Sequence, residues 1–104
     1  MLFIGWTTVA SSVDAERLAL EAIGSGAAVC VQIEGPIHSI YRWEGKVERS
    51  TEYRLAIKFL DTQRGALETA LFAAHPYKTP EWVVIEAHSV SEKYLSWARS
   101  LVQS

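Results

Sequence analysis

A few side chains in this sequence are of the types that bind divalent metals. His75 is the leading candidate, because imidazole binds Cu(II), Ni(II) and Zn(II) well and this histidine directly precedes Pro76. Cys30 would supply a soft thiolate ligand, and Glu81 would supply a carboxylate. We therefore expect any metal contact to use His75, with help from Cys30 or Glu81. The pattern requires no cofactor, and Cu(II) or another divalent metal is the candidate ligand.

Structural roles compete with metal binding at the histidines and the cysteine. A charged His75 at the end of a helix would complement the helix dipole or hydrogen-bond the last carbonyl groups. Cys30 lies in an expected strand, and an unpaired cysteine often serves only as a small buried hydrophobic residue. At both residues the structural role outweighs metal binding. His38 and His88 show no H-x-H or H-x-x-x-H spacing with a partner, so we expect both at the surface.

A second set of candidates combines aromatic rings with a few polar groups. A cleft with aromatic walls and convergent polar groups is the usual form of a small-ligand site. If subunits pack together, such a cleft would be lined by Tyr41, Trp43, Lys58, His75, Tyr77, Glu81, Tyr94 and Trp97. The structural alternative is that Trp43, Tyr94 and Trp97 only pack at an interface. Lys58 and Glu81 would then form an ion pair.

Charge and composition exclude several classes of partner. The chain has 104 residues, which fits one domain over residues 1–104. Its formal net charge of −2 argues against nucleic acid and anionic lipid as partners. No uncharged apolar run approaches the ~20 residues that span a bilayer, so we expect no membrane partner. Cys30 is the only cysteine and cannot close an internal disulfide, which favours a cytoplasmic location.

Signatures of catalysis are missing from the sequence. It contains no Gly-x-Gly-x-x-Gly, Walker, nucleophile-elbow or Cys-x-x-Cys motif. The carboxylates Glu48 and Glu52 give no clear acid–base geometry. We therefore expect a binding protein and not an enzyme.

The elements that must position these residues follow from hydrophobic periodicity. Residues 2–9 are typical of a central strand, and a helix follows that begins at Ser11 or Ser12 and ends at Gly24-Ser25-Gly26. Residues 27–34 alternate as a strand that places Cys30 in its middle, on the more polar face. Gly35-Pro36 interrupts this strand, which resumes at 37–43. Glu44-Gly45 indicates a hairpin turn into a strand over 46–60.

The second half repeats the pattern and adds a helix. Asp61 or Thr62 caps a helix that Pro76 ends, and residues 82–85 are expected as a buried strand. Ser89-x-x-Glu92 resembles a capping box that opens a last helix. Two βαβ units predict an α+β fold, a ferredoxin-like βαββαβ sandwich with a long projecting hairpin and an extra C-terminal helix.

The hairpin is too long for its own domain. Residues 46–60 would span roughly 45 Å at ~3.3 Å per residue, whereas a domain of this size is roughly 25–30 Å across. The hairpin must therefore bend, near Ser50-Thr51, or project and pair with another chain. The four Trp, four Tyr and three Phe exceed what a thin two-layer domain hides, so oligomerisation is predicted.

Three segments resemble the CutA family of divalent-cation tolerance proteins. They are SIYRWEGK at 39–46, HPYKTPE at 75–81 and YLSW at 94–97, in the same order and spacing. The resemblance covers nearly the whole chain. It implies a ferredoxin-like homotrimer whose sheets face inward and whose hairpins pair between subunits. It also implies tolerance of copper and other divalent cations, with no settled catalytic activity.

The resemblance is incomplete at the copper ligands proposed for bacterial members of that family. Those ligands are a cysteine at the end of the first strand and two adjacent histidines before the proline. Here Thr7 (or Trp6) stands at the first position, and the histidine pair is Ala74-His75. A second hypothesis, by analogy with other ferredoxin-like trimers, is a trimeric signalling or ligand-sensing module that binds a small anionic metabolite between subunits. Its positive charge would come from Lys58, Arg42 and Lys78.

Overall fold

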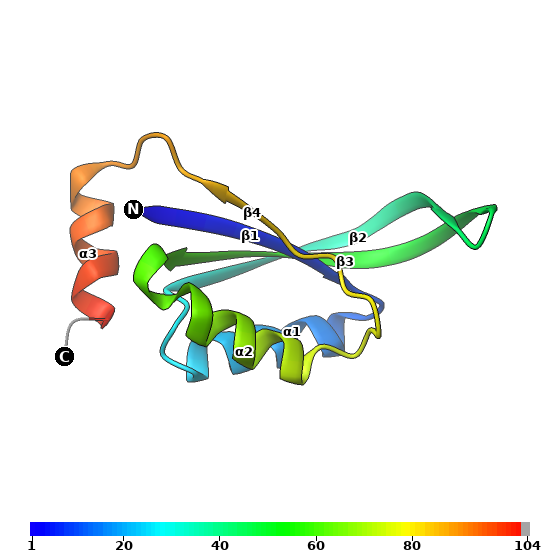
Figure 1. The fold of residues 1–104 in the computed structure, drawn as a ribbon, viewed down its shortest axis with the longest axis horizontal. Coiled ribbons are helices and arrows are strands. Elements are labelled where there is room, and N and C mark those ends of the chain that lie inside the picture. Colours follow the sequence, from blue (N-terminus) through cyan, green and yellow to red (C-terminus); the bar gives the residue numbers. More distant parts are fainter. Residues whose placement is uncertain (103–104) are drawn as a thin grey trace.

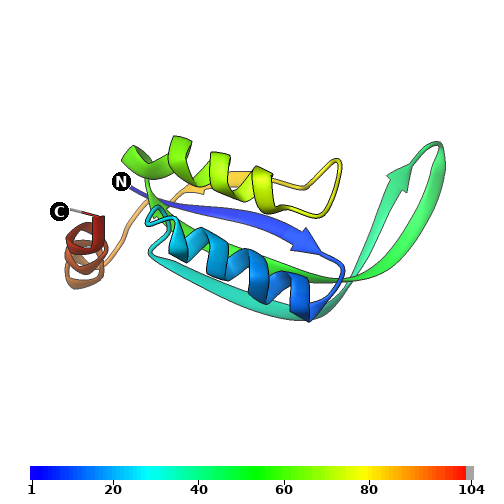
Figure 2. The same ribbon diagram turned by 90° about the horizontal axis from the view of Figure 1, so that it is seen from below.

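The computed structural model describes residues 1–102, which form one antiparallel sheet and three α-helices (Figure 1). The elements run in the order β1 (Leu2–Val9), α1 (Ser12–Gly24), β2 (Cys30–Trp43), β3 (Lys46–Leu60), a 3₁₀ turn (Asp61–Gln63), α2 (Arg64–Ala74), β4 (Val83–Glu86) and α3 (Glu92–Val102). Figure 2 shows α1 and α2 side by side on one face of the sheet. Helix α3 lies across the end of the sheet where the chain begins.

The strand order is β2-β3-β1-β4, with every neighbouring pair antiparallel. In register, Leu2 pairs with Leu60, and Trp6 pairs with Ala56 on one side and Val83 on the other. This order confirms the predicted ferredoxin-like α+β sandwich with a projecting hairpin and a third helix.

The main core lies between the sheet and the first two helices. Helix α1 begins where the Ser11 hydroxyl accepts the Asp14 N–H at 3.1 Å, the cap expected from the sequence. One stripe of α1 and two leucines of α2 pack onto alternate residues of β1 and β3. The buried members are Val9, Ala15, Leu18, Ala22, Ala27, Ala28, Leu55, Ile57, Phe59, Leu67 and Leu71.

Strands β2 and β3 continue beyond the sheet as a long hairpin. The molecule measures 46 Å along its longest axis but only 26 and 21 Å along the others. Glu44 and Gly45 make the turn with φ of 50° and 77°, a region that glycine adopts readily. The hairpin therefore projects beyond the rest of the domain, which is one of the two alternatives expected from its length.

The irregularity in the hairpin lies on β2 and not at the expected Ser50-Thr51. The register shifts between Glu34 and Ile37, and the Gly35–Pro36 peptide bond is cis. A β-carbon at Gly35 would clash with the Tyr53 ring, so only glycine lets this ring pack against the strand. Proline cannot donate to the ladder, which explains why the irregularity is here.

Four expected boundaries or burials were wrong. Helix α2 begins at Arg64 without a side-chain cap, so the expected cap at Asp61 or Thr62 is not formed. Strand β2 begins at Cys30 and not at 27, because Ala27 and Ala28 are buried in the main core and Val29 is buried in the cluster beside α3. Strand β4 is not buried within one chain, since it is an edge strand with half-exposed Val83 and Ile85. Helix α3 opens at Glu92, where the Ser91 carbonyl accepts the Leu95 N–H.

The predicted capping box at Ser89 is wrong, because α3 begins three residues later, at Glu92. The segment before α3 is neither helix nor strand, with the Ala87 N–H bonded to the Leu2 carbonyl and Val90 packed on a second core cluster. Ser89 therefore precedes the helix by more than one residue and cannot cap it.

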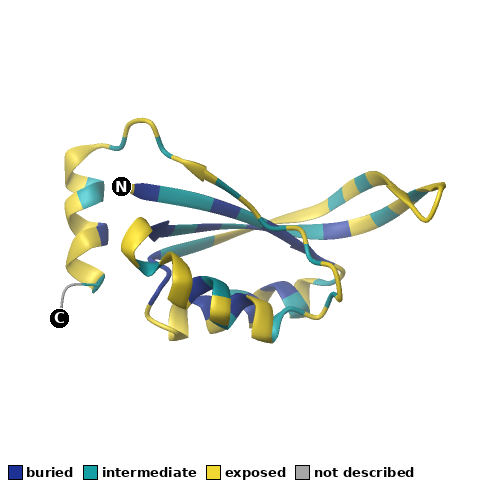
Figure 3. Cartoon of the chain, viewed as in Figure 1, coloured by how far each residue is buried: buried dark blue, intermediate teal, exposed yellow. Residues whose placement is uncertain are grey.

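The sheet face opposite α1 and α2 is only partly covered. Helix α3 packs onto one end of it, around Leu2, Val29, Leu60 and Ala98. Beyond α3, the register of β1 and β4 places Ile4, Trp6 and Ile85 on the same face, and none of the three is buried. Figure 3 shows β4 coloured as intermediate and exposed along its length. A band of apolar surface thus remains open along the sheet.

Candidate functional site

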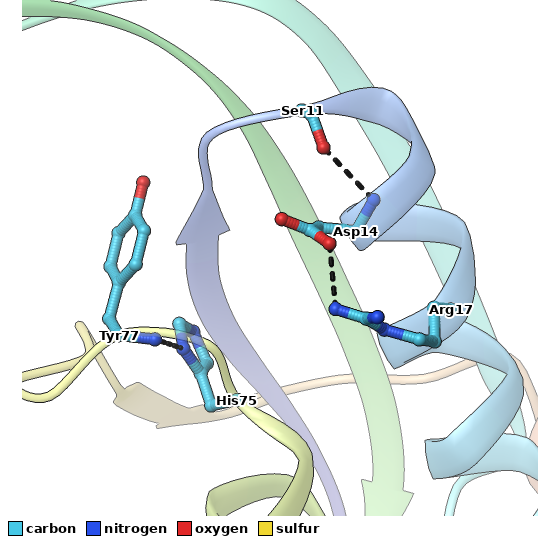
Figure 4. A network of polar contacts seen from close by, with 5 residues as sticks. All are labelled: Ser11, Asp14, Arg17, His75 and Tyr77. Atoms are coloured by element: carbon cyan, nitrogen blue, oxygen red, sulfur yellow. Dashed lines mark hydrogen bonds and ion pairs between the residues drawn. The ribbon is translucent and has the colours of Figure 1, made fainter.

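His75 is joined to β1 by a side-chain hydrogen bond. Its Nε2 lies 2.9 Å from the Thr7 hydroxyl, and Thr7 is fully buried. The Tyr77 N–H donates to Nδ1 of the same ring at 3.1 Å, as Figure 4 shows. Because Nδ1 accepts this bond, the network assigns the proton to Nε2, which donates to Thr7.

The environment of His75 favours the neutral imidazole. Burial lowers the pKa of His75, and a hydrogen bond with the Thr8 backbone opposes part of that effect. The residue ends α2 through its backbone N–H, which donates to the Leu71 carbonyl. The ring itself faces β1, so a charged imidazole that complements the α2 dipole is not favoured.

Tyr77 joins the same loop to the hairpin. Its hydroxyl donates to Oε2 of Glu52 at 2.9 Å. Glu52 is 8% exposed, and burial followed by this hydrogen bond raises the pKa of Tyr77 above its ordinary value. The loop after α2 is therefore held by Thr7 on β1 and by Glu52 on β3.

A groove of about 950 Å³ lies between the projecting hairpin and this loop. Three carboxylates line it, from Glu48, Glu52 and Glu81, with Lys78 as the one lining cation. Tyr41, Trp43 and Tyr77 provide aromatic walls. The other lining residues are Thr8, Ala10, Ser39, Ile40, Ser50, Thr51, Pro76 and Thr79.

The structure divides the predicted cleft residues between the two ends of the molecule. Tyr41, Trp43, Tyr77 and Glu81 line the groove, and His75 lies behind it in contact with Tyr77.

The other predicted cleft residues gather at α3. Lys58 Nζ lies 5.4 Å from the centroid of the Tyr94 ring, which is 5.4 Å from the Trp97 ring. In residues 1–102 Lys58 forms no ion pair with Glu81. One chain alone therefore does not bring the whole set together.

The three predicted metal ligands are also separated. Cys30 opens β2 opposite Lys58 and is half-buried beside α3, so its expected position in the middle of a strand was wrong. His75 contacts Thr7 near the far end of β1, and Glu81 lines the groove. Across residues 1–102, no three His, Cys, Asp or Glu side chains lie close enough together to hold a metal ion.

Sequence analysis did not find the role of Glu52. The sequence feature that could have indicated this role is the alternation of side chains along β3, which places Glu48, Ser50 and Glu52 on one face. The burial of Glu52 and its bond to Tyr77 depend on a loop 25 residues away, which alternation does not predict.

No helix within residues 1–102 has the length and apolar character needed to cross a membrane.

Comparison with known proteins identifies relatives over almost the full chain. The family model described as CutA1 divalent ion tolerance protein matches residues 3–101. The divalent-cation tolerance protein CutA of Yersinia pestis (strain Pestoides F) is 36% identical over 90 residues, which are 86% of this chain and 76% of that protein.

Solved structures agree in fold. CutA from Synechococcus elongatus PCC7942 superposes with a TM-score of 0.92 at 39% identity, over 98% of this chain and 90% of that one. The divalent cation tolerance protein of Thermus thermophilus superposes with a TM-score of 0.93 at 31% identity, over 99% of this chain and 100% of that one. The periplasmic divalent cation tolerance protein CutA of Archaeoglobus fulgidus superposes with a TM-score of 0.93 at 30% identity, over 99% of this chain and 100% of that one. This chain therefore belongs to the CutA1 family of divalent ion tolerance proteins.

Proposed function

We propose that this chain acts in divalent-cation tolerance as a homotrimer that binds a cation, such as Cu(II), and catalyses no reaction. The observation that carries the proposal is the charge of the groove, which has three lining carboxylates against one lysine. A cleft lined by charge of one sign concentrates ions of the opposite sign. That electrostatic character matches the role for which the family is named.

His75 is the residue that we propose as the metal ligand. Metals bind the neutral imidazole, and burial already favours that form by lowering the pKa of His75. The Nε2–H is held by Thr7, and a ligating histidine commonly donates its other N–H to such an orienting partner. The metal would bind at Nδ1, where it would displace the Tyr77 N–H. Glu81, or Cys30 of a neighbouring subunit, would supply a further ligand.

The homotrimer is supported by surfaces that one chain leaves uncovered. Strands β2 and β4 each have a free edge, and such edges pair readily with another chain. Strand β2 exposes Ile33, and the projecting hairpin exposes Val47, both outside the groove. The open sheet face adds further apolar surface beside β4, so another subunit has both a ladder to extend and a face to cover.

Calorimetric titration with Cu(II) tests the metal site. The wild-type chain and His88→Ala, which removes an exposed histidine, should bind with the same affinity, whereas His75→Ala should bind at least tenfold more weakly. Equal binding by all three proteins would remove His75 from the site. Light scattering tests the assembly, with an expected mass three times the 11.6 kDa chain. A mass near 11.6 kDa would contradict the trimer.

Charge separates this proposal from the anionic-metabolite alternative. Lys78 lines the groove among carboxylates, whereas Lys58 lies at the α3 end against Tyr94. An anion in the groove would meet net repulsion. A thermal-shift screen separates the two, because stabilisation by nucleotides or carboxylates and by no metal would favour the alternative.

A cytoplasmic location is part of the proposal, supported by the single unpaired cysteine. The Archaeoglobus fulgidus relative is described as periplasmic, so the compartment needs its own measurement. Cell fractionation should recover the protein with cytoplasmic markers, and recovery with periplasmic markers would contradict this part of the proposal.

A further inference from the structure

The groove contains two similar pairs, each made of an acid and an aromatic ring. Glu52 accepts the Tyr77 hydroxyl at 2.9 Å and is almost fully buried. Glu48 lies directly across the β2–β3 ladder from Tyr41, so this carboxylate and ring share one face of the hairpin. A carboxylate beside an aromatic ring suits an alkylammonium group, which gains both charge pairing and cation–π attraction.

The spacing of the two pairs indicates the kind of ligand. Glu48 and Glu52 are four residues apart on β3, where the ladder is regular, so their backbones are about 13 Å apart at ~3.3 Å per residue. A single metal ion cannot contact both carboxylates across that distance. A flexible chain with a positive charge at each end can contact both, and its methylene groups would lie along apolar wall between them.

The remaining walls suit such a chain. Ile40 and Trp43 provide apolar surface, and Glu81 adds a third carboxylate on the loop side. The volume of about 950 Å³ is at the upper end of small-ligand sites, which range from roughly 300 to 1,000 Å³. Lys78 is the single unfavourable charge in the lining.

We propose that this groove binds a linear aliphatic polyamine, with one ammonium group at Glu52 and Tyr77 and another at Glu48 and Tyr41. This site goes beyond the proposed metal role, and the two proposals have only Glu81 and the negative charge of the groove in common. The metal would bind at Nδ1 of His75 behind the loop, whereas the polyamine would lie along the hairpin.

The test uses spermidine as the probe and calorimetry of the full chain at constant ionic strength. Glu48→Gln and Tyr41→Leu should each weaken spermidine binding about threefold to fivefold, as expected for a partly exposed charge contact and a partly exposed cation–π contact. Glu21→Gln is the matched control, because it removes an exposed carboxylate on α1 outside the groove. This control should bind spermidine like the wild type.

Two further measurements place the ligand in the groove. Lys78→Gln removes the opposing charge and should tighten spermidine binding. Trp43 should report binding by a saturable change in fluorescence that Trp43→Phe removes, although Trp6, Trp82 and Trp97 remain.

The outcomes distinguish this proposal from the metal proposal. Tyr41→Leu should leave Cu(II) affinity unchanged while it weakens spermidine, so either function can fail alone. Undetectable spermidine binding at millimolar concentration would overturn the polyamine site. Equal losses in Glu48→Gln and Glu21→Gln, or equal affinity for propylamine and spermidine, would also overturn it.

Discussion

The Thr7 hydroxyl and Nε2 of His75 lie 2.9 Å apart, although 68 positions separate the two residues in the chain. This contact joins the middle strand β1 to the loop that leaves α2. It also fixes the tautomer of the imidazole, because Tyr77 donates to the other ring nitrogen. The orientation of the proposed metal ligand therefore depends on a buried threonine.

Thr7→Val should destabilise the protein by about 1–2 kcal/mol, because it leaves the His75 N–H without its partner in a buried site. Urea unfolding measures this change. The matched control is Thr62→Val, since Thr62 is exposed and its hydroxyl makes no hydrogen bond within residues 1–102. Equal stability of the two variants would show that the Thr7–His75 bond contributes nothing.

The pH dependence of stability follows from the lowered pKa of His75. Burial holds the folded-state pKa below the ordinary 6.5, so at intermediate pH the unfolded state binds more protons than the folded state. The contribution of the neutral His75 to the free energy of unfolding is therefore complete above pH 6.5. It is lost as the pH falls toward and through the lower folded-state pKa. The free energy of unfolding should decline on acidification through this range.

His75→Asn isolates this effect, because asparagine does not titrate. The variant should lose part of the pH dependence between about pH 7 and pH 5, the range in which histidine titrates, while His88→Ala should keep it. An identical pH dependence in wild type and His75→Asn would contradict the assignment to this residue.

Tyr77→Phe should destabilise the protein by about 1–3 kcal/mol, because it removes the hydrogen bond to the nearly buried Glu52 carboxylate. Tyr41→Phe serves as the control, since Tyr41 is exposed and makes no side-chain hydrogen bond in residues 1–102. Thermal unfolding compares them. A Tyr77→Phe midpoint equal to that of Tyr41→Phe would mean that the loop is held by other contacts.

Gly5→Ala tests how closely the segment before β4 packs on β1. A β-carbon at Gly5 would clash with the Trp82 ring, which stacks on Phe59. The variant should lose about 1–3 kcal/mol through overpacking. Gly65→Ala on α2 has no neighbour within 4 Å and should gain about 0.5–1 kcal/mol through helix propensity. Chemical denaturation that ranks Gly5→Ala at or above wild type would refute this packing.

The order of elements could be predicted because each depends on a local pattern. The stripe of Ala15, Leu18 and Ala22 specifies a helix, and the turn at Glu44-Gly45 specifies a hairpin, without any knowledge of the rest of the chain. The boundaries were less accurate. Cys30 is the first residue of its strand and does not lie in its middle, because tertiary packing buries the three residues before it.

The candidate site depends on contacts that local patterns do not encode. Residue types drew attention to His75 and Tyr77, but their partners Thr7 and Glu52 come from two distant strands. The division of the aromatic residues between the groove and α3 follows from strand register, which places Lys58 opposite Cys30 and far along β3 from Glu48. Spacing in the sequence cannot specify that separation.

The most direct test of the central claim is a crystal structure of the full chain soaked with Cu(II), with anomalous differences measured at the copper edge. We expect a peak at Nδ1 of His75, within about 2.0–2.2 Å of that nitrogen as for other imidazole–metal bonds, and displacement of the Tyr77 N–H from it. Density only at other residues, with the Tyr77–His75 hydrogen bond intact, would contradict the claim that this chain binds its cation through His75.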